Sequence, residues 1–187
     1  MSTSDRSAER RLPDGTGVRL RAVGYADPVA YELVERVQQE YVRRYGGRDE
    51  AAVDPAEFEP PVGSFLVADV DGVPAGCGGW RVHGYGAAPG SVEVKRVYVE
   101  PAFRRRGLAQ LLMAALEDDA AAAGHRAVVL NSGDRQPEAL ALYAALGYAP
   151  VPGYGRYAGM PGAVFLGKEI TVGPATGDDE EERPWAS

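Results

Sequence analysis

The sequence predicts an α/β protein with a mixed sheet and helices on both of its faces. Segments that alternate apolar and polar residues with period two are interleaved with segments whose apolar residues recur every three or four positions. The run at 127–130 is apolar without alternation, which is typical of a strand buried on both faces. With 187 residues, the chain is long enough to bury the core of one domain.

The first elements follow from alternation and from helix-capping residues. Residues 18–23 alternate and predict a strand. Asp27 is a favourable N-cap, Pro28 suits the first helical position, and Gly46 is a good terminator. We therefore expect a helix from Pro28 to about Tyr45.

The remaining elements are a hairpin, a central strand and two further helices with their strands. Asp71-Gly72 is a strong hairpin signal. Further strands are expected at 64–70, 73–83, 92–99, 127–130, 148–151 and 163–170, and further helices at 107–124 and 137–146. The alternation in 92–99 slips by one position around Arg96 and Val97, which predicts a β-bulge there.

The two ends of the chain differ in composition from the middle. Residues 1–17 hold few apolar side chains and are expected to be a disordered lead-in. Residues 171–187 form an acidic tail that we also expect to be disordered. The predicted domain is therefore 18–170. The tail accounts for about −4 of the formal net charge of −7, so the rest of the chain is close to neutral.

Composition argues against several classes of protein. Apolar runs are too short to span a bilayer, and residues 1–11 lack the apolar core of a secretory signal. The single cysteine, Cys77, cannot form an internal disulfide, so a reducing cytoplasm is the expected location. No basic patch indicates nucleic-acid binding, and no histidine or cysteine cluster has metal-ligand spacing, so neither partner is expected.

The segment 92–123 carries the clearest functional signal. A strand that breaks register is followed by a short connection, by Arg104, Arg105 and Arg106, by Gly107, and then by a strong helix-forming pattern. The free N–H groups and the positive dipole end of a new helix favour an anion. Gly107 lets the main chain approach that anion closely. We expect a phosphate to bind here.

The residues of this turn resemble a known family. Arg104-Arg105-Arg106-Gly107-Leu108-Ala109 fits the Q/R-x-x-G-x-G/A signature of the GCN5-related N-acetyltransferases (GNAT). The segment 136–148, QPEALALYAALGY, resembles the N-x-x-A-x-x-L-Y-x-x-x-G-F/Y segment of the same family. The two motifs in this order make the resemblance specific over residues 18–170. It implies a mostly antiparallel sheet of about six or seven strands, splayed at the central strand.

The resemblance also implies acetyl-CoA as cofactor and assigns residues to it. The main chain at 105–109 would bind the pyrophosphate, with the side chains of Arg104, Arg105 and Arg106 as added attraction. Many members have glycine in place of Arg105, so this residue must adopt an ordinary φ or contact the cofactor itself. Further contacts are expected from the strand 97–99, that is Val97, Tyr98 and Val99, and from Gln136 and Asn131. For Asn131 a role in its turn is the alternative.

Catalytic roles follow from the same resemblance. The Val97 N–H would polarise the thioester carbonyl, and Val99 would pair with the pantetheine arm. Glu93 occupies the position of a catalytic base; alternatively it is an exposed glutamate paired with Lys95, and a water chain could then serve as base. Tyr143 would protonate the leaving thiolate, because a phenol stays protonated at neutral pH. Its alternative role is that of a core aromatic residue.

The acceptor side is expected to come from the first long helix and from the loop 152–162. The candidate contact residues are Glu40, Tyr41, Tyr45, His83, Tyr154 and Tyr157. Tyrosines with scattered charges suit a small polar amine, so the leading hypothesis is acetylation of a small-molecule amine by direct attack. The alternatives are a protein lysine or N-terminal acetyltransferase, which an open groove would favour, and a non-catalytic acyl-CoA sensor. Since family members often dimerise, a homodimer is expected.

Overall fold

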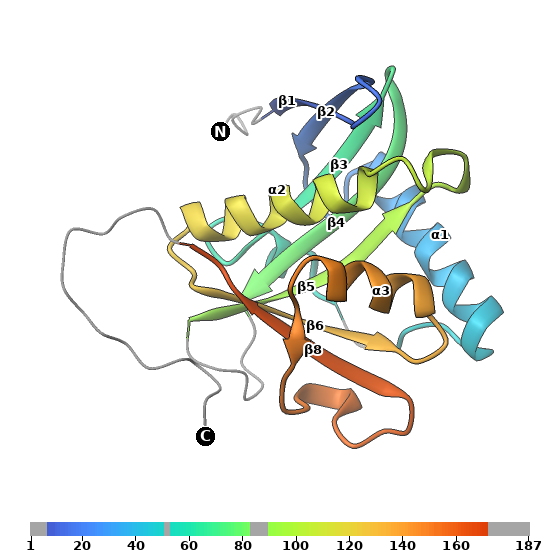
Figure 1. Cartoon of the computed structure of the whole chain (residues 1–187), viewed down its shortest axis with the longest axis vertical. Coiled ribbons are helices and arrows are strands. Elements are labelled where there is room, and N and C mark those ends of the chain that lie inside the picture. Colours follow the sequence, from blue (N-terminus) through green and yellow to red (C-terminus); the bar gives the residue numbers. More distant parts are fainter. Residues whose placement is uncertain (1–6, 51–52, 83–89, 172–187) are drawn as a thin grey trace.

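The chain folds around one eight-stranded sheet, seen here in a computed structural model that describes residues 7–50, 53–82 and 90–171 (Figure 1). The strands are β1 (Ser7–Arg11), β2 (Gly17–Ala22), β3 (Gly63–Val70), β4 (Val73–Val82), β5 (Ser91–Val99), β6 (Ala127–Gly133), β7 (Ala149–Pro150) and β8 (Ala163–Glu169). The α-helices are α1 (Pro28–Tyr45), α2 (Leu108–Ala122) and α3 (Pro137–Ala145). The strand order is β1-β2-β3-β4-β5-β6-β8-β7, and β5 and β6 form the parallel pair in an otherwise antiparallel sheet.

This architecture confirms the predicted fold class and corrects one boundary. The expected disordered lead-in is wrong for residues 7–11, which form strand β1 antiparallel to β2. Four of its five side chains are exposed, so the strand is held mainly by main-chain hydrogen bonds at the edge of the sheet. Its sequence therefore shows no alternation of apolar and polar residues from which a strand could be predicted. The expected acidic tail and His83 lie outside the described residues, apart from the tail's first residue, 171.

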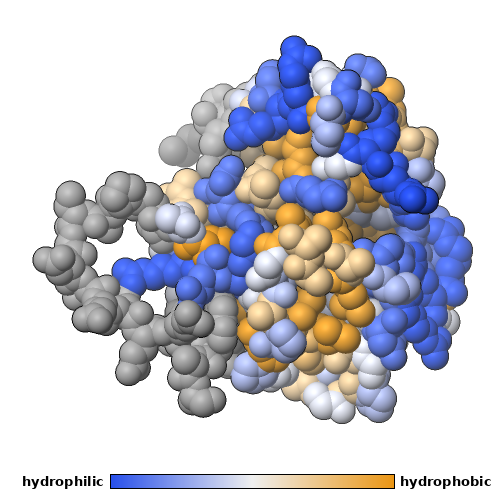
Figure 2. All heavy atoms as spheres, in the orientation of Figure 1, coloured by the Kyte–Doolittle hydropathy of each residue, from blue (hydrophilic) through white to orange (hydrophobic). Residues whose placement is uncertain are grey.

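Helices cover both faces of the sheet, as predicted. Met113 and Leu116 of α2 and Tyr143 of α3 pack against Val92 and Val94 of β5 on one face. Leu33 and Val37 of α1 pack on the other face, against residues of β3 and β4. Figure 2, seen from the face covered by α2 and α3, shows apolar residues gathered around α3 and hydrophilic residues along α1. The central strands are therefore buried between two helical layers.

The predicted β-bulge in the central strand is present. Cys77 pairs with Tyr98 and Gly79 pairs with Lys95, so the single residue Gly78 of β4 faces two residues of β5, Arg96 and Val97. Arg96 adopts the left-handed conformation with φ of 60°, which is uncommon for a residue other than glycine. The bulge bends β5 at its middle.

The bent strand separates from its parallel neighbour. β5 and β6 stay in register only from Ser91 to Val94, opposite 127–130. Beyond this point β5 continues along β4 as far as Val99, whereas β6 continues along β8 as far as Gly133. The sheet therefore opens as a wedge between the two strands.

Candidate active site

The turn that joins β5 to α2 presents a group of free main-chain donors. Across the described part of the chain, the N–H groups of residues 105–110 have no hydrogen-bond acceptor. Gly107 is the N-cap with φ of 92°, and no acidic side chain stands in the first helical turn. Converging N–H groups at the positive end of a helix bind anions, so the geometry agrees with the predicted phosphate site.

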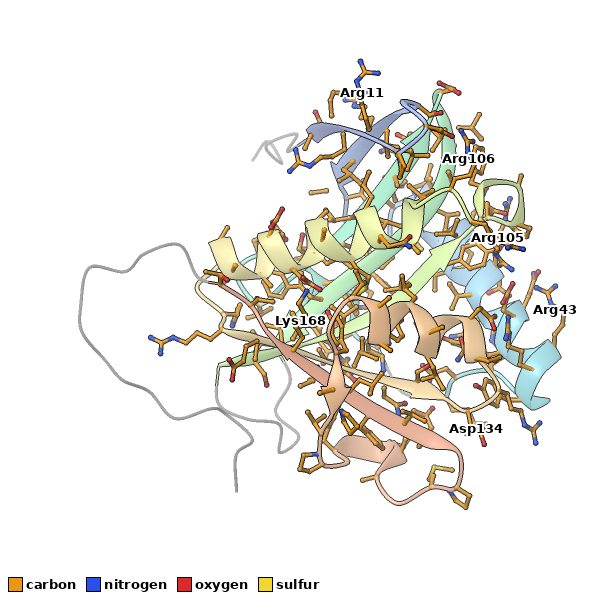
Figure 3. All side chains as sticks on the ribbon, in the orientation of Figure 1. Arg11, Arg43, Arg105, Arg106, Asp134 and Lys168 are labelled. Atoms are coloured by element: carbon orange, nitrogen blue, oxygen red, sulfur yellow. The ribbon has the colours of Figure 1, made fainter. Side chains whose placement is uncertain are left out.

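Arg105 keeps the turn in a conformation that glycine would adopt more easily. Its φ is 61°, so the alternative of an ordinary φ is wrong. The left-handed conformation costs about 1–2 kcal/mol for a residue with a Cβ. Its guanidinium makes no hydrogen bond or ion pair with another described residue, and Figure 3 places it with Arg106 at the end of the sheet where α2 begins. Arg105 is thus available to an anionic ligand.

Arg104 and Arg106 have a different function in the turn. Arg104 Nε donates to the Val99 carbonyl oxygen at 2.8 Å, and its guanidinium pairs with Glu40 of α1. Arg106 Nη2 donates to Asp14 at 2.9 Å and to the Thr16 hydroxyl at 2.8 Å, in the connection between β1 and β2. Both side chains anchor the turn to its surroundings, so what the turn itself offers an anion is its main chain and Arg105.

A pocket of about 500 Å³ occupies the wedge between β5 and β6. Its walls come from the end of α1, the segment after it, the diverging ends of β5 and β6, and the loop before β8. The lining residues are Tyr41, Tyr45, Gly47, Arg48, Asp49, Val94, Lys95, Arg96, Asn131, Ser132, Gly133, Asp134, Arg135, Gln136, Tyr157, Met160, Pro161, Gly162 and Ala163. The loop residues 157 and 160–163 form one wall of this pocket.

The structure sorts the predicted acceptor residues into two groups. Tyr41, Tyr45 and Tyr157 line the pocket. Glu40 and Tyr154 do not: the Glu40 carboxylate is held by Arg104 and Arg44, and Tyr154 is buried against the ring of Phe165 at 5.1 Å. Tyr154 was expected at the pocket because it lies in the tyrosine-rich loop, but its side chain turns inward to fill the core below.

Two predicted cofactor residues line the same pocket. Asn131, in β6, donates to the carbonyl oxygens of Ser132 and Val164, both at 3.3 Å. Gln136 Nε2 donates to the Tyr45 hydroxyl at 3.2 Å. The structure therefore brings both side chains to the wedge, with their amide groups engaged by the protein.

Tyr143 is a core aromatic residue, as one of its two expected roles requires, and its role as an acid stays a prediction. It is 8% exposed, and its ring packs edge-on against Tyr148 at 5.7 Å in the core under α3. Burial, and to a smaller extent the nearby Tyr41 phenol, raise the pKa of Tyr143 well above the ordinary value. Its hydroxyl makes no hydrogen bond with another described residue. The side chain is a core aromatic that also carries a protonated, unengaged hydroxyl next to a pocket residue.

Glu93 is buried, contrary to the expectation of an exposed residue. The predicted pairing with Lys95 is present at 3.6 Å, and Arg81 Nε and Nη2 each lie 3.0 Å from Glu93 Oε2. With its side chain 7% exposed and away from the lining of the pocket, the carboxylate contacts cations rather than open space. Its role as a base stays a prediction.

Sequence analysis missed a buried ion pair at the wall of the pocket. The side chain of Arg96 is 2% exposed, and its Nη1 lies 2.6 Å from Asp49 Oδ2. The Tyr157 hydroxyl donates to the other oxygen of Asp49, while the Asp49 N–H donates to Gln38 Oε1 at 2.9 Å. In the sequence, the one sign of this ion pair was a charged residue, Arg96, at the position where the alternation of β5 breaks. The polar segment around Asp49 contained no sign that one of its residues would be buried.

Comparison with known proteins relates the chain to acetyltransferases. Residues 30–148 match the model of the family described as "Acetyltransferase (GNAT) family". A protein of Azospirillum brasilense named IAA acetyltransferase is 31% identical over 142 residues, which are 74% of this chain and 89% of that protein.

Solved structures share the fold. The GNAT domain of S. lividans PAT has a TM-score of 0.69 at 22% identity, covering 88% of this chain and 97% of that one. The PaiA N-acetyltransferase of Thermoplasma acidophilum, solved in complex with coenzyme A, has a TM-score of 0.60 at 13% identity, covering 82% and 99%. Within the described ranges, none of the helices has the length and apolar character needed to cross a bilayer.

Replacing Asp49 by asparagine tests the importance of the buried ion pair. The variant leaves the Arg96 guanidinium buried without a counter-charge, so the free energy of unfolding should fall by about 3 kcal/mol in denaturant titrations. Glu35→Gln is the matched control, because Glu35 pairs with Arg48 at the surface, and it should cost less than about 1 kcal/mol. Equal losses in the two variants would contradict the assignment.

Proposed function

The chain belongs to the GNAT family of acetyltransferases, and on this premise we propose that it acetylates the primary amine of a small molecule by direct attack, without an acyl-enzyme. The protein is an acyl-CoA-dependent N-acetyltransferase, and its cofactor is acetyl-CoA. The observation that carries the choice of a small acceptor is the pocket in the wedge between β5 and β6, whose volume of about 500 Å³ is typical of small-molecule sites and whose one wall is formed by residues 157 and 160–163. The predicted homodimer and cytoplasmic location stay predictions.

The residues present fit this cofactor. The unengaged N–H groups of residues 105–110 and the free guanidinium of Arg105 suit a pyrophosphate. Glu100 N–H donates to Ala75 of β4, so by strand alternation the main-chain groups of Val99 point away from β4; the Val99 carbonyl oxygen accepts from Arg104, and its N–H faces the wedge. That edge of β5 has no strand partner after Val94, and an extended amide-containing chain can pair with it.

Bound acetyl-CoA supplies an acyl thioester, and the surrounding residues have three tasks. Val97, the second residue of the bulge, is in register with no residue of β4 or β6, and in the proposed mechanism its N–H would donate to the thioester carbonyl oxygen. Tyr143 Oη holds a proton at neutral pH and can donate it to a thiolate. Glu93, or a water chain in its place, would accept the proton of the acceptor amine.

Direct attack is supported by the state of the single cysteine. Cys77 is fully buried in β4, and its Sγ contacts the Arg96 carbonyl oxygen at 3.4 Å. Burial raises the pKa of the Cys77 thiol far above the ordinary value. Since the thiolate is the nucleophilic form, this residue is not suited to carry an acyl group.

Thermal unfolding with and without acetyl-CoA, followed by a transfer assay over a panel of amines, tests the proposal. At about one hundred times its Kd, the cofactor should stabilise the protein by about 2.7 kcal/mol. Transfer to small primary amines, with none to lysine-containing peptides, is the expected result. Peptide acetylation at equal or greater kcat/KM would favour the protein acetyltransferase instead.

A carboxylate placed in the turn should abolish cofactor binding. In Gly107→Asp a negative charge enters the proposed pyrophosphate site, and the φ of 92° strains any side chain. We expect the stabilisation by acetyl-CoA to disappear. Gly147→Asp is a matched control, because Gly147 has φ of 85° at the end of α3 and open space around it, and it should retain the stabilisation.

Removal of the Tyr143 hydroxyl should reduce turnover more than binding. Tyr143→Phe keeps the packing and is expected to lower kcat about a hundredfold with little change in the Kd for acetyl-CoA. Tyr148→Phe, which loses a hydrogen bond to Glu117, should change stability rather than kcat. Because the pKa of Tyr143 is raised, loss of its proton should not lower kcat of the unmodified protein between pH 7 and about 10. Unchanged kcat in Tyr143→Phe would exclude the acid role.

A further inference from the structure

We propose that the acceptor carries a carboxylate besides its amine and that the Lys95 ammonium binds this carboxylate. The acceptor class is then an α-amino acid or a closely similar amino carboxylate. This inference rests on the proposed function, since it names the acceptor that the same pocket takes.

Lys95 is a cation on the pocket wall that lacks a close partner. Its side chain is 11% exposed, and its nearest carboxylate oxygen, Glu93 Oε1, lies 3.6 Å away, longer than a hydrogen bond. No other described residue accepts a hydrogen bond from Lys95 Nζ. An ammonium has three donors, and the protein supplies no close acceptor for them on this half-buried side chain. An anionic ligand in the pocket would supply the acceptor atoms.

Glu93 is held more closely by Arg81 than by Lys95. Arg81 approaches Glu93 Oε2 with two nitrogens at 3.0 Å, whereas Lys95 Nζ faces the other oxygen, Oε1, at 3.6 Å. Arg81 also pairs with Glu57, whose side chain is 40% exposed and therefore weakly held. The Glu93 carboxylate thus contacts two cations, and its contact with Lys95 is the longer and weaker of the two.

The arginines on the pocket wall are engaged elsewhere. Arg96 pairs with Asp49 at 2.6 Å, and Arg48 pairs with Glu35 through two contacts of 2.7 Å. Arg135 lies exposed over the Tyr45 ring and donates to the Arg44 carbonyl oxygen at 3.1 Å. Among the cations that line the described pocket, Lys95 is therefore the half-buried one without a hydrogen-bonded partner among the described residues.

The position of Lys95 also fits the chemistry. It directly precedes the bulge residues Arg96 and Val97, and the Val97 N–H is the group proposed to polarise the thioester. In an α-amino acid the amine and the carboxylate share one carbon, so an acceptor held by its carboxylate on Lys95 keeps its amine at this part of β5. Asp134, exposed at the end of β6 on the same pocket, adds the opposite charge that a zwitterion requires (Figure 3).

A carboxylate is favoured over a phosphate because the site offers one cation. The neighbouring donors are the neutral hydroxyls of Tyr41 and Tyr45, and burial raises the pKa of Tyr41 to about 12, so it stays protonated. Phosphate sites usually combine several unengaged cations, whereas Arg48, Arg96 and Arg135 on the wall of this pocket are engaged by other groups of the protein.

Matched pairs of amines test the inference directly. Each pair is an L-amino acid and its decarboxylated amine, for example phenylalanine with phenethylamine and leucine with isoamylamine. The full-length protein should acetylate the amino acid with a kcat/KM about 10 to 100 times that of the amine. This ratio corresponds to the free energy that one charge-assisted hydrogen bond contributes. In Lys95→Gln and Lys95→Met this ratio should fall to near one, mainly through KM.

The chain provides a control in its one other lysine, Lys168. Lys168 lies in β8, where it pairs with Glu117 at 2.6 Å away from the pocket lining. Lys168→Gln should keep the preference for the amino acid even if its melting temperature falls. This control separates a folding defect from the loss of the carboxylate contact.

A second comparison tests the kind of anion that the site prefers. If kcat/KM is higher for 1-aminoethylphosphonate than for alanine, the site is selective for a phosphonate rather than for a carboxylate.

Calorimetric binding of the same pairs, without acetyl-CoA, gives a readout independent of turnover. The amino acid should bind the unmodified protein at least about tenfold more tightly than Lys95→Gln. Equal kcat/KM for both members of each pair, or an equal loss for both in Lys95→Gln, would overturn the inference while leaving the small-molecule acetyltransferase intact. Absence of transfer to any amine, with binding preserved, would instead overturn the proposed reaction and leave the carboxylate site standing.

Discussion

Arg96 adopts the left-handed conformation, which costs about 1–2 kcal/mol, and its guanidinium is held by the buried ion pair with Asp49. The extra residue at this point bends β5 away from β6, so the pocket and the unpaired strand edge both depend on it. A regular strand in the same place would have continued the parallel pairing and closed the sheet. The site is therefore a consequence of one local irregularity that tertiary contacts maintain.

Charged side chains around this irregularity have distinct tasks. Arg104 and Arg106 tie the turn before α2 to α1 and to the first hairpin, and Arg96 fixes the bulge. Arg105 and Lys95 lack close partners in the described structure, and both stand where an anion is expected to bind. The division between engaged and unengaged cations distinguishes residues that build the site from residues that can bind ligands in it.

Much of the fold was predictable because its signals are local. The caps of α1, the Asp71-Gly72 turn and the slip at Arg96 and Val97 all depend on near neighbours in the sequence, and the structure contains each of them. Strand β1 was not predictable, because an edge strand with exposed side chains is stabilised mainly by main-chain pairing. The Asp49 contact was missed for a related reason: it joins segments 47 residues apart, and sequence periodicity carries no information about such pairs.

The hydrogen bond from Tyr157 to Asp49 has a consequence for how acceptor preference can change. Tyr157 belongs to the loop before β8, which forms a pocket wall, yet its hydroxyl also supports the carboxylate that holds the bulge. The loop therefore cannot diverge freely: a replacement chosen to admit a different amine also alters the support of the strand on which transfer depends. Grafting loops from other acetyltransferases should succeed more often when the graft keeps a hydroxyl donor at this position.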